Sequence, residues 1–270
     1  MISVIIPTLN EQESIGYCVR SLLEQNIDRD SYEIIVVDGG SGDRTREIAG
    51  QCADRVVSQK RSGIGGARGD GVEASQGDIL VFTDADTLHL GNWLELIREN
   101  LTDRGCDVST GPVLFYDKTF RSELIQLWRK QYKFFHLFGF YWLIGSNVAM
   151  KRETYDRIDG HKDISILEDY DLSVRMFKEG DIACCYDRRQ AVYTSARRLN
   201  NLLTYMKIYM YGHYHYRVTK DSAQLLQYPR FDAMDLKVMP DIIGMKQVNE
   251  KISSSYAKFI STIEKLEGRQ

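Results

Sequence analysis

Four short apolar runs organise the first part of the chain, and each is followed by a polar turn and a segment with helical spacing. The runs cover residues 2–6, 33–37, 55–58 and 79–82. Their lack of strict alternation between apolar and polar positions is typical of strands buried on both faces of a parallel sheet. Strand, helix, strand, helix at this spacing predicts βαβ units, and therefore an α/β fold with a doubly wound, mostly parallel sheet.

The later part of the chain carries a weaker version of the same pattern. We expect helices over about 92–101, 120–135 and 166–178, and strands over 107–114, 145–150, 182–186 and 191–194. Beyond residue 199 the sequence becomes aromatic and basic, and an apolar helical stripe then runs from Ile252 to Leu266. Such a stripe more often forms a packing or oligomer face than a cofactor site. We therefore predict an α/β domain over 1–198 and a helical extension over 199–270 that approaches a membrane or a second copy of the chain.

The composition narrows the classes of function. The chain has 270 residues, of which 43% are hydrophobic and 27% are charged, as in an ordinary globular protein. A net charge of −3 gives no general attraction to nucleic acid, so we expect no nucleic-acid partner. The five cysteines show neither metal-ligand spacing nor an even framework, and we expect reduced thiols of a cytosolic protein. We also expect no secretion signal and no membrane span, because Met1 leads directly into a strand and the apolar segment 134–150 is short and interrupted.

Polar turns follow three of the predicted strands at the point where each ends. These turns are Thr8–Glu11, Asp38–Asp43 and Asp84–Asp86. The carboxyl ends of parallel strands meet at one edge of a sheet, and ligands bind there. Glycines in the second turn allow backbone N–H groups to approach an anion closely. The sequence therefore predicts a ligand site at this edge.

Two features of this edge allow more than one interpretation. Asp84 and Asp86 suit a hard divalent cation, which is typically held by one or two carboxylates and by substrate phosphates, but Asp-x-Asp fits a helix cap and a solvated side chain equally well. The segment 63–69 suits neither nucleotide-binding loop. Arg68 stands where the dinucleotide motif needs its third glycine, and no Gly-Lys-Ser/Thr sequence forms a P-loop.

Two further groups of polar residues fit either a structural role or a functional role. Glu168, Asp169 and Asp171 begin a predicted helix, where the macrodipole favours acidic residues. His213 and His215 would supply a further metal ligand, although helix histidines are more often polar surface.

Five short motifs together resemble family 2 glycosyltransferases with the GT-A fold. The resemblance covers residues 1 to about 198, and its motifs are residues 4–11, 35–41, 66–68, 83–86 and 167–169. It implies a Rossmann-like, mostly parallel sheet with helices on both faces. It also implies inverting transfer of a sugar from a nucleoside diphosphate, with a UDP-sugar favoured over a GDP-sugar, to a hydroxyl of a lipid-linked or polysaccharide acceptor.

The resemblance also implies roles for individual residues. The nucleoside side is formed by Pro7, Thr8, Glu11, Asp38 and Arg68, with Asp84 on the ribose. Asp86 binds Mg²⁺ or Mn²⁺, Asp169 is the general base beside Glu168, and Arg197 and Arg198 face the diphosphate. This chemistry is sound without the family name, because the leaving diphosphate needs a cation and the acceptor hydroxyl needs a proton acceptor. Asp171 remains an alternative base.

Two other functions fit part of the pattern. A sugar-nucleotide pyrophosphorylase shares the nucleotide-binding sheet and Mg²⁺, but usually has a glycine-rich, arginine-containing loop after its first strand, where this chain has Pro7–Glu11. A non-catalytic nucleotide-sugar binding module would keep the fold and need no base.

An aromatic segment raises the question of a membrane. Residues 134–144 are dense in aromatic and apolar side chains and follow Arg129, Lys130 and Lys133. Basic residues beside aromatic ones suit the headgroup region of a bilayer. Burial under the sheet explains the segment as well. We nevertheless predict peripheral contact with the cytoplasmic face of a membrane.

Overall fold

The structure is a computed structural model that describes residues 1–117, 119–129 and 135–197, together with positions 211, 212, 215, 216, 220 and 225. Within these residues lies a seven-stranded sheet with the order β3-β2-β1-β4-β8-β6-β9. Its strands are β1 (Ile2–Thr8), β2 (Tyr32–Asp38), β3 (Arg55–Ser58), β4 (Ile79–Phe82), β6 (Val108–Thr110), β8 (Val148–Lys151) and β9 (Cys184–Tyr186). Only β8 runs against its neighbours in this sheet, so the predicted mostly parallel arrangement is confirmed.

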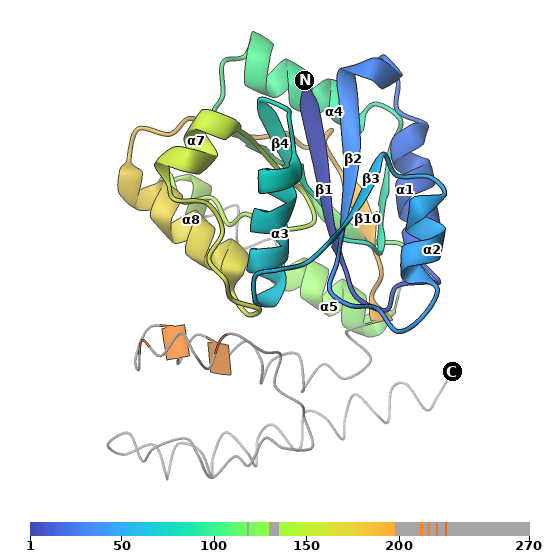
Figure 1. Cartoon of the computed structure of the whole chain (residues 1–270). Helices are drawn as coiled ribbons and strands as arrows, with labels where there is room; N and C mark the ends of the chain where they lie inside the picture. Colours follow the sequence, from blue (N-terminus) through green and yellow to red (C-terminus); the bar gives the residue numbers. More distant parts are fainter. Residues whose placement is uncertain are drawn as a thin grey trace, which may run out of the picture. The chain divides into compact units, whose positions relative to one another are not determined.

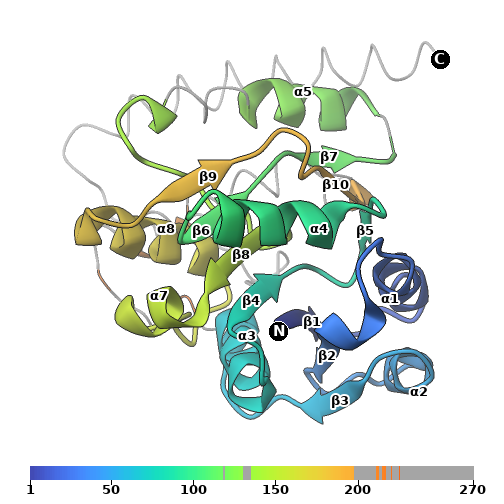
Figure 2. The ribbon, with the colours of Figure 1, turned by 90° about the horizontal axis from the view of Figure 1, so that it is seen from above.

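Helices cover both faces of this sheet. Helices α1 and α2 lie on one side of β1 and β2, and α3 lies on the other (Figures 1 and 2). Every residue of β1 is buried. Val4 and Ile6 pack into the core on the side of α1, whereas Ile5 packs into the core on the side of α3. A strand between two helical layers needs apolar side chains on both faces, which explains its unbroken apolar run.

The predicted helices occur in their predicted order with shifted ends, and α7 (Arg152–Arg157) is an additional helix that the sequence analysis did not predict. Their bounds are α1 (Ile15–Leu23), α2 (Thr45–Gly50), α3 (Gly63–Ala74), α4 (Trp93–Arg98), α5 (Phe120–Arg129), α7 (Arg152–Arg157) and α8 (Glu168–Glu179), with short helical turns η1 (Arg29–Ser31) and η2 (Glu99–Asp103). Helix α1 begins at Ile15, so a turn separates it from β1, and this turn is hydrogen-bonded to the turn after β2 through Asn10 and Ser41. Among the described helices, none combines the length and the apolarity needed to cross a bilayer.

The strand predicted over 107–114 is two strands in two sheets. The chain leaves β6 at Gly111 and Pro112 and enters β7 (Val113–Phe115), which joins a small sheet with β5 (Thr87–His89) and β10 (Val192–Thr194) in the order β5-β10-β7. A Cβ at position 111 would lie 2.2 Å from the carbonyl oxygen of Gln190, so only glycine fits there. Pro112 has no N–H to continue a ladder. The change of sheet places Thr194 opposite Thr87, directly after Asp86.

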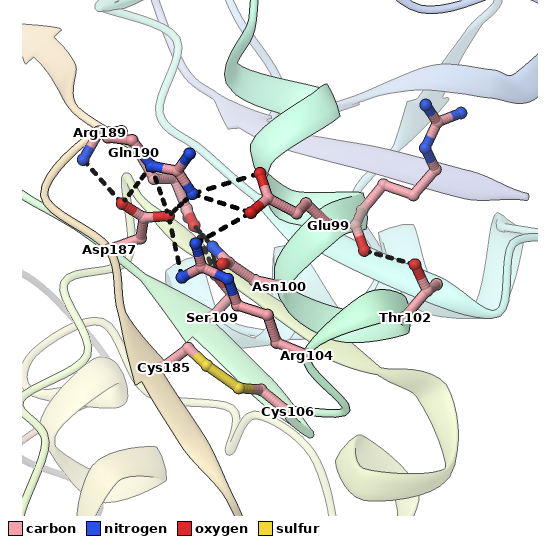
Figure 3. Close-up of polar contacts among 11 residues, drawn as sticks. Glu99, Asn100, Thr102, Arg104, Cys106, Ser109, Cys185, Asp187, Arg189 and Gln190 are labelled. Atoms are coloured by element: carbon pink, nitrogen blue, oxygen red, sulfur yellow. Dashed lines mark hydrogen bonds and ion pairs between the residues drawn. A yellow bond between two sulfur atoms is a disulfide. The ribbon is translucent and has the colours of Figure 1, made fainter.

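The cysteines correct the expectation of reduced thiols. A disulfide joins Cys106 and Cys185, whose Cα atoms are 6.0 Å apart, while Cys18, Cys52 and Cys184 are free (Figure 3). The bridge forms because β6 and β9 are parallel neighbours, a long-range pairing that cysteine spacing does not reveal. Disulfides are rare in cytosolic proteins of mesophiles, so the cysteines no longer support the cytosolic location.

The predicted helical extension over 199–270 lies outside the described residues except at six positions. Three of these contact the start of α8. Tyr211, Tyr216 and Leu225 pack in one cluster with Ile166, Leu167 and Tyr170. The backbone N–H of Ser165 also donates to the carbonyl oxygen of Leu225 at 2.7 Å. Part of the sequence beyond residue 198 therefore packs on the segment that leads into Glu168 and Asp169.

Candidate active site

The ends of β1 and β2 bring two of the predicted nucleoside residues together. Thr8 and Asp38 are register partners in the parallel pair, and both are buried. The carboxylate of Asp38 accepts hydrogen bonds from the backbone N–H groups of Gly40 at 3.2 Å and Ser41 at 3.3 Å. The hydroxyl of Thr8 has no hydrogen-bond partner in the described part of the chain. Asp38 therefore shapes the glycine turn, and Thr8 retains a buried hydroxyl at the mouth of the predicted site.

The two carboxylates after β4 have different partners. Asp86 is 7% exposed, and its Oδ1 accepts a hydrogen bond from the hydroxyl of Thr194 at 3.1 Å. Its Oδ2 lies 3.3 Å from Nη2 of Arg197. The more exposed Asp84 instead accepts from Nη2 of Arg68 at 2.9 Å. The pair therefore does not act as one acidic cluster in this structure, and the two side chains serve two parts of the site.

Arg68 connects the end of β4 with the start of α8. Its side chain is 1% exposed, and its Nη1 donates to Oε1 of Glu168 at 2.5 Å while its Nη2 binds Asp84. Gly145 makes room for it, because a Cβ at that position would lie 2.3 Å from Nη2. A buried guanidinium needs such partners, since its desolvation is otherwise uncompensated. The structure thus places Arg68 as a buried link within the site, although the sequence predicted a position beside the nucleoside or the diphosphate.

Asp169 is the carboxyl group whose chemistry is most altered by its surroundings. It lies in the first turn of α8, after Leu167 in the left-handed backbone conformation (φ 62°). Burial, assisted by the negative charge of Glu168, raises the pKa of Asp169 to about 8, against the opposing effects of Arg68 and a hydrogen bond from the backbone of Gly145. A carboxyl group with a pKa near the working pH suits a general base.

Asp171, the alternative base, is engaged on both oxygens. Its Oδ2 accepts from Nε of Arg175 at 2.7 Å, and its Oδ1 accepts from the hydroxyl of Tyr216 at 2.7 Å. Two charge-assisted or strong hydrogen bonds hold this carboxylate in place and occupy both of its oxygens. The hydrogen bonds on Asp171 agree with the order that the resemblance implied, with Asp169 as the first candidate, and the identity of the base stays a prediction.

Arg197 joins the turn after β1 to the turn after β4. Its Nη2 forms an ion pair with Oε1 of the buried Glu11 as well as with Asp86. Asp117 fixes the preceding backbone, because its Oδ2 accepts from the N–H of Ala196 at 3.0 Å. Of the other predicted residues, Pro7 lies at the buried end of β1, and the ring of His215 lies 4.3 Å from that of Tyr211. Arg198 and His213 lie outside the described residues.

Four residues of this arrangement were missed by the sequence analysis, namely Asp117, Gly145, Thr194 and Tyr216. Thr194 ends a strand that the sequence did predict, but its pairing with β5 was not predictable. Gly145 begins a predicted strand, and a glycine there is a weak signal of close backbone approach. Asp117 and Tyr216 follow no pattern that marks them. All four act through contacts between segments that are distant in sequence.

The described residues fit a divalent cation only in part. No group of three or more His, Cys, Asp or Glu side chains among them is arranged to hold a metal ion. Asp86 alone offers a buried hard oxygen ligand at the predicted position. One carboxylate together with substrate phosphates is, however, a usual Mg²⁺ site. The donor set therefore suits a cation that binds together with a phosphate-containing ligand.

Comparison with known proteins identifies the same family that the sequence motifs resemble. Residues 3–158 match the family model described as glycosyl transferase family 2. Glycosyltransferase AglE of Haloferax volcanii is 37% identical over 120 residues, which are 42% of this chain and 40% of that protein. The chain therefore spans less than half the length of this relative. The matches remove the support for the pyrophosphorylase interpretation.

Solved structures resemble the fold over most of the chain. The mannosyltransferase PcManGT from Pyrobaculum calidifontis, in complex with GDP-Man and Mn²⁺, superposes with a TM-score of 0.61 at 20% identity, covering 81% of this chain and 64% of that one. Glucosyl-3-phosphoglycerate synthase from Mycobacterium tuberculosis, in complex with Mn²⁺, UDP and glucosyl-3-phosphoglycerate, has a TM-score of 0.61 at 22% identity and covers 79% and 78% of the two chains. The predicted GT-A fold is confirmed.

The raised pKa of Asp169 predicts a pH-dependent effect of Asp169→Asn on stability. The carboxyl group ionises near pH 3.9 in an unfolded chain and near pH 8 in the folded protein. The wild type should therefore lose stability relative to Asp169→Asn as the pH rises from about 4 to about 8, by up to about 1.4 kcal/mol per pH unit, with no further change above that range.

Urea unfolding of both proteins at about pH 5, 7 and 9 measures this difference. Asp181→Asn is a matched control, because that carboxylate is exposed and its pair with Arg157 is on the surface. A stability difference between wild type and Asp169→Asn that is the same at all three values would contradict the assignment of a raised pKa.

Proposed function

The chain belongs to glycosyl transferase family 2, and we propose that it transfers a sugar from a nucleoside diphosphate to an acceptor hydroxyl with inversion at the anomeric carbon. One observation carries the proposal. Buried Arg68 binds both Asp84, on the predicted donor side, and Glu168, which precedes the predicted base Asp169. This link brings the two functions of a glycosyl transfer into one site.

The donor side is formed by the strand-end turns. We place the nucleoside against Pro7, Thr8, Glu11 and Asp38 and the ribose at Asp84. The two compared structures contain GDP-Man in one case and UDP in the other, each with Mn²⁺. A UDP-sugar is our first choice of donor and a GDP-sugar our second.

Two carboxylates have separate roles in the proposed reaction. Asp86 would hold Mg²⁺ or Mn²⁺, which supplies positive charge to the leaving diphosphate when it is bound. Asp169 takes the proton of the acceptor hydroxyl as its oxygen bonds to the anomeric carbon. The bond between that carbon and the diphosphate oxygen breaks on the opposite side, which inverts the configuration. A half-buried carboxyl group with a pKa of about 8 favours this reaction over the alternative of a non-catalytic binding module.

The donor proposal predicts metal-dependent nucleotide binding that requires Asp86. UDP or GDP with Mn²⁺ should raise the melting temperature of the wild type, because a ligand at 100 times its dissociation constant adds about 2.7 kcal/mol to the stability. Asp86→Asn should retain the fold and lose the Mn²⁺-dependent part of this shift. An equal shift in EDTA and in Mn²⁺ would show that no metal takes part.

The base proposal predicts a large loss of turnover in Asp169→Asn with almost unchanged donor affinity. The substitution keeps the size of the side chain and removes the proton acceptor, so the rate of nucleoside diphosphate release with acceptor should fall by about 10²–10⁴-fold. Asp171→Asn is the matched control on the same helix turn and should have a smaller effect. The reverse order of the two effects would assign the base to Asp171.

We also propose that the acceptor is lipid-linked or lies close to a membrane. The segment predicted over 134–144 is divided, because Leu143 is fully buried while Leu137 and Phe138 are 78% and 64% exposed. Phe134 lies outside the described residues. Exposed apolar side chains such as these suit the headgroup region of a bilayer. Of the basic residues that precede them in the sequence, Arg129 contacts Val113 and Phe115, and Lys130 and Lys133 lie outside the described residues.

Liposome co-sedimentation tests this contact. Wild type should bind vesicles that contain anionic lipids, more strongly at low salt, and Leu137→Asp with Phe138→Asp should bind several-fold less because charge opposes insertion. Tyr17→Asp is the control, since Tyr17 is 65% exposed on α1. Absence of wild-type binding at both salts, or an equal loss in the control, would remove the membrane from the proposal.

A further inference from the structure

The place predicted for the metal at Asp86 is already taken by a positive side chain. Thr194 binds one carboxylate oxygen of Asp86 at 3.1 Å, and Nη2 of Arg197 lies 3.3 Å from the other. The same Nη2 also pairs with Glu11. A divalent cation that binds Asp86 must therefore displace a protein partner.

We propose that Arg197 is an internal substitute for the divalent cation, which it excludes from Asp86 until a diphosphate is present to receive the guanidinium. The proposal rests on the proposed function, because it assumes that the same carboxylate serves a donor with its metal. It adds that metal and diphosphate bind cooperatively, and that a single arginine produces this coupling.

The charges of the cluster favour an exchange in which the divalent cation replaces the guanidinium of Arg197 at Asp86. Glu11 and Asp86 are 8% and 7% exposed, and two carboxylates at that burial are costly without a positive partner. Arg197 supplies this charge in the absence of ligand. Glu11, Asp86 and Arg197 together carry one net negative charge. A divalent cation that entered alone would reverse this sign and repel the guanidinium, whereas a diphosphate that entered alone would make the cluster more negative. Binding of the two together restores the resting charge and lets the planar guanidinium pair with phosphate oxygens, which it suits well.

The structure allows the exchange without movement of the backbone. Asp117 accepts from the N–H of Ala196 at 3.0 Å and from the hydroxyl of Ser195 at 3.3 Å. The N–H of Arg197 donates to Ser195 Oγ at 3.1 Å. The main chain is thus anchored up to Arg197, while the side chain of Arg197 is 41% exposed and ends on two buried acids. We therefore place the exchange in the side chain of Arg197, because the backbone that precedes it is held by Asp117.

Coupling between two ligands is reciprocal and is typically 5–150-fold. In the wild type, Mn²⁺ alone should therefore bind weakly, and UDP or GDP should tighten its binding. Removal of the competing guanidinium should strengthen binding of Mn²⁺ alone, by about tenfold. It should also weaken nucleotide binding in the presence of Mn²⁺, because the diphosphate loses its arginine.

Arg197→Gln tests these effects through the free Mn²⁺ signal in electron paramagnetic resonance, first without nucleotide and then with UDP or GDP. Arg189→Gln is the matched control, because Arg189 lies on the connection that precedes β10, whereas Arg197 follows β10, and Arg189 pairs with Asp187 and Glu99 (Figure 3). We expect a lower dissociation constant for Mn²⁺ alone in Arg197→Gln and none of this change in Arg189→Gln.

An unchanged dissociation constant for Mn²⁺ in folded Arg197→Gln would overturn the inference. If Arg197→Gln does not fold, Arg197→Met replaces it. Methionine keeps an unbranched side chain and removes the charge, so this variant should bind Mn²⁺ alone more tightly than the wild type, and equality would again overturn the inference. Failure of the wild type to bind UDP or GDP with Mn²⁺ would instead count against the proposed function, and the two failures are therefore distinguishable.

Discussion

A single buried cation holds the two sides of this site together. Arg68 is almost fully buried on α3 and forms ion pairs with Asp84 after β4 and with Glu168, 100 positions away in the sequence. Loss of one partner from a buried ion pair typically costs about 3–5 kcal/mol, because the remaining charge is uncompensated. The fold must therefore keep the end of β4 and the start of α8 at a fixed separation. The positions of the predicted ribose ligand and of the predicted base both depend on this constraint.

The small sheet adds the second constraint. Gly111 and Pro112 move the chain from the large sheet to β7, which pairs with β10, and β10 pairs in turn with β5 after Asp86. This route brings Thr194 and Arg197 to a carboxylate that lies more than 100 residues earlier in the sequence. Positive and negative side chains therefore alternate in the site. The buried acids Glu11, Asp86 and Glu168 each pair with an arginine before any ligand binds.

Features that depend on local sequence patterns, namely the strands and the polar turns that follow them, were predicted correctly. The apolar runs located β1 to β4, and the polar turns that follow β1, β2 and β4 placed Thr8, Asp38, Asp84 and Asp86 at one edge of the sheet. The partners of Asp86 were not predictable, because Thr194 and Arg197 reach it through the long-range pairing of β10 with β5. Asp117 and Gly145 were missed for the same reason, since one holds the backbone before Arg197 and the other makes room for Arg68. The Cys106–Cys185 disulfide was not predicted for the same reason, because the two cysteines come together only through the parallel pairing of β6 with β9. Asp169 was predicted by resemblance, whereas the partners Arg175 and Tyr216 on Asp171 could not be predicted from the sequence.

The central claim is that the turns after β1, β2 and β4 hold a nucleoside diphosphate with its cation at Asp86, opposite Asp169. Crystals grown with Mn²⁺ and UDP or GDP test it most directly, because anomalous scattering at the manganese edge locates the ion independently of the nucleotide density. The account predicts one Mn²⁺ between the carboxylate of Asp86 and the diphosphate, with the base of the nucleotide over Thr8 and Asp38. A manganese peak or a nucleotide bound away from these turns would contradict it.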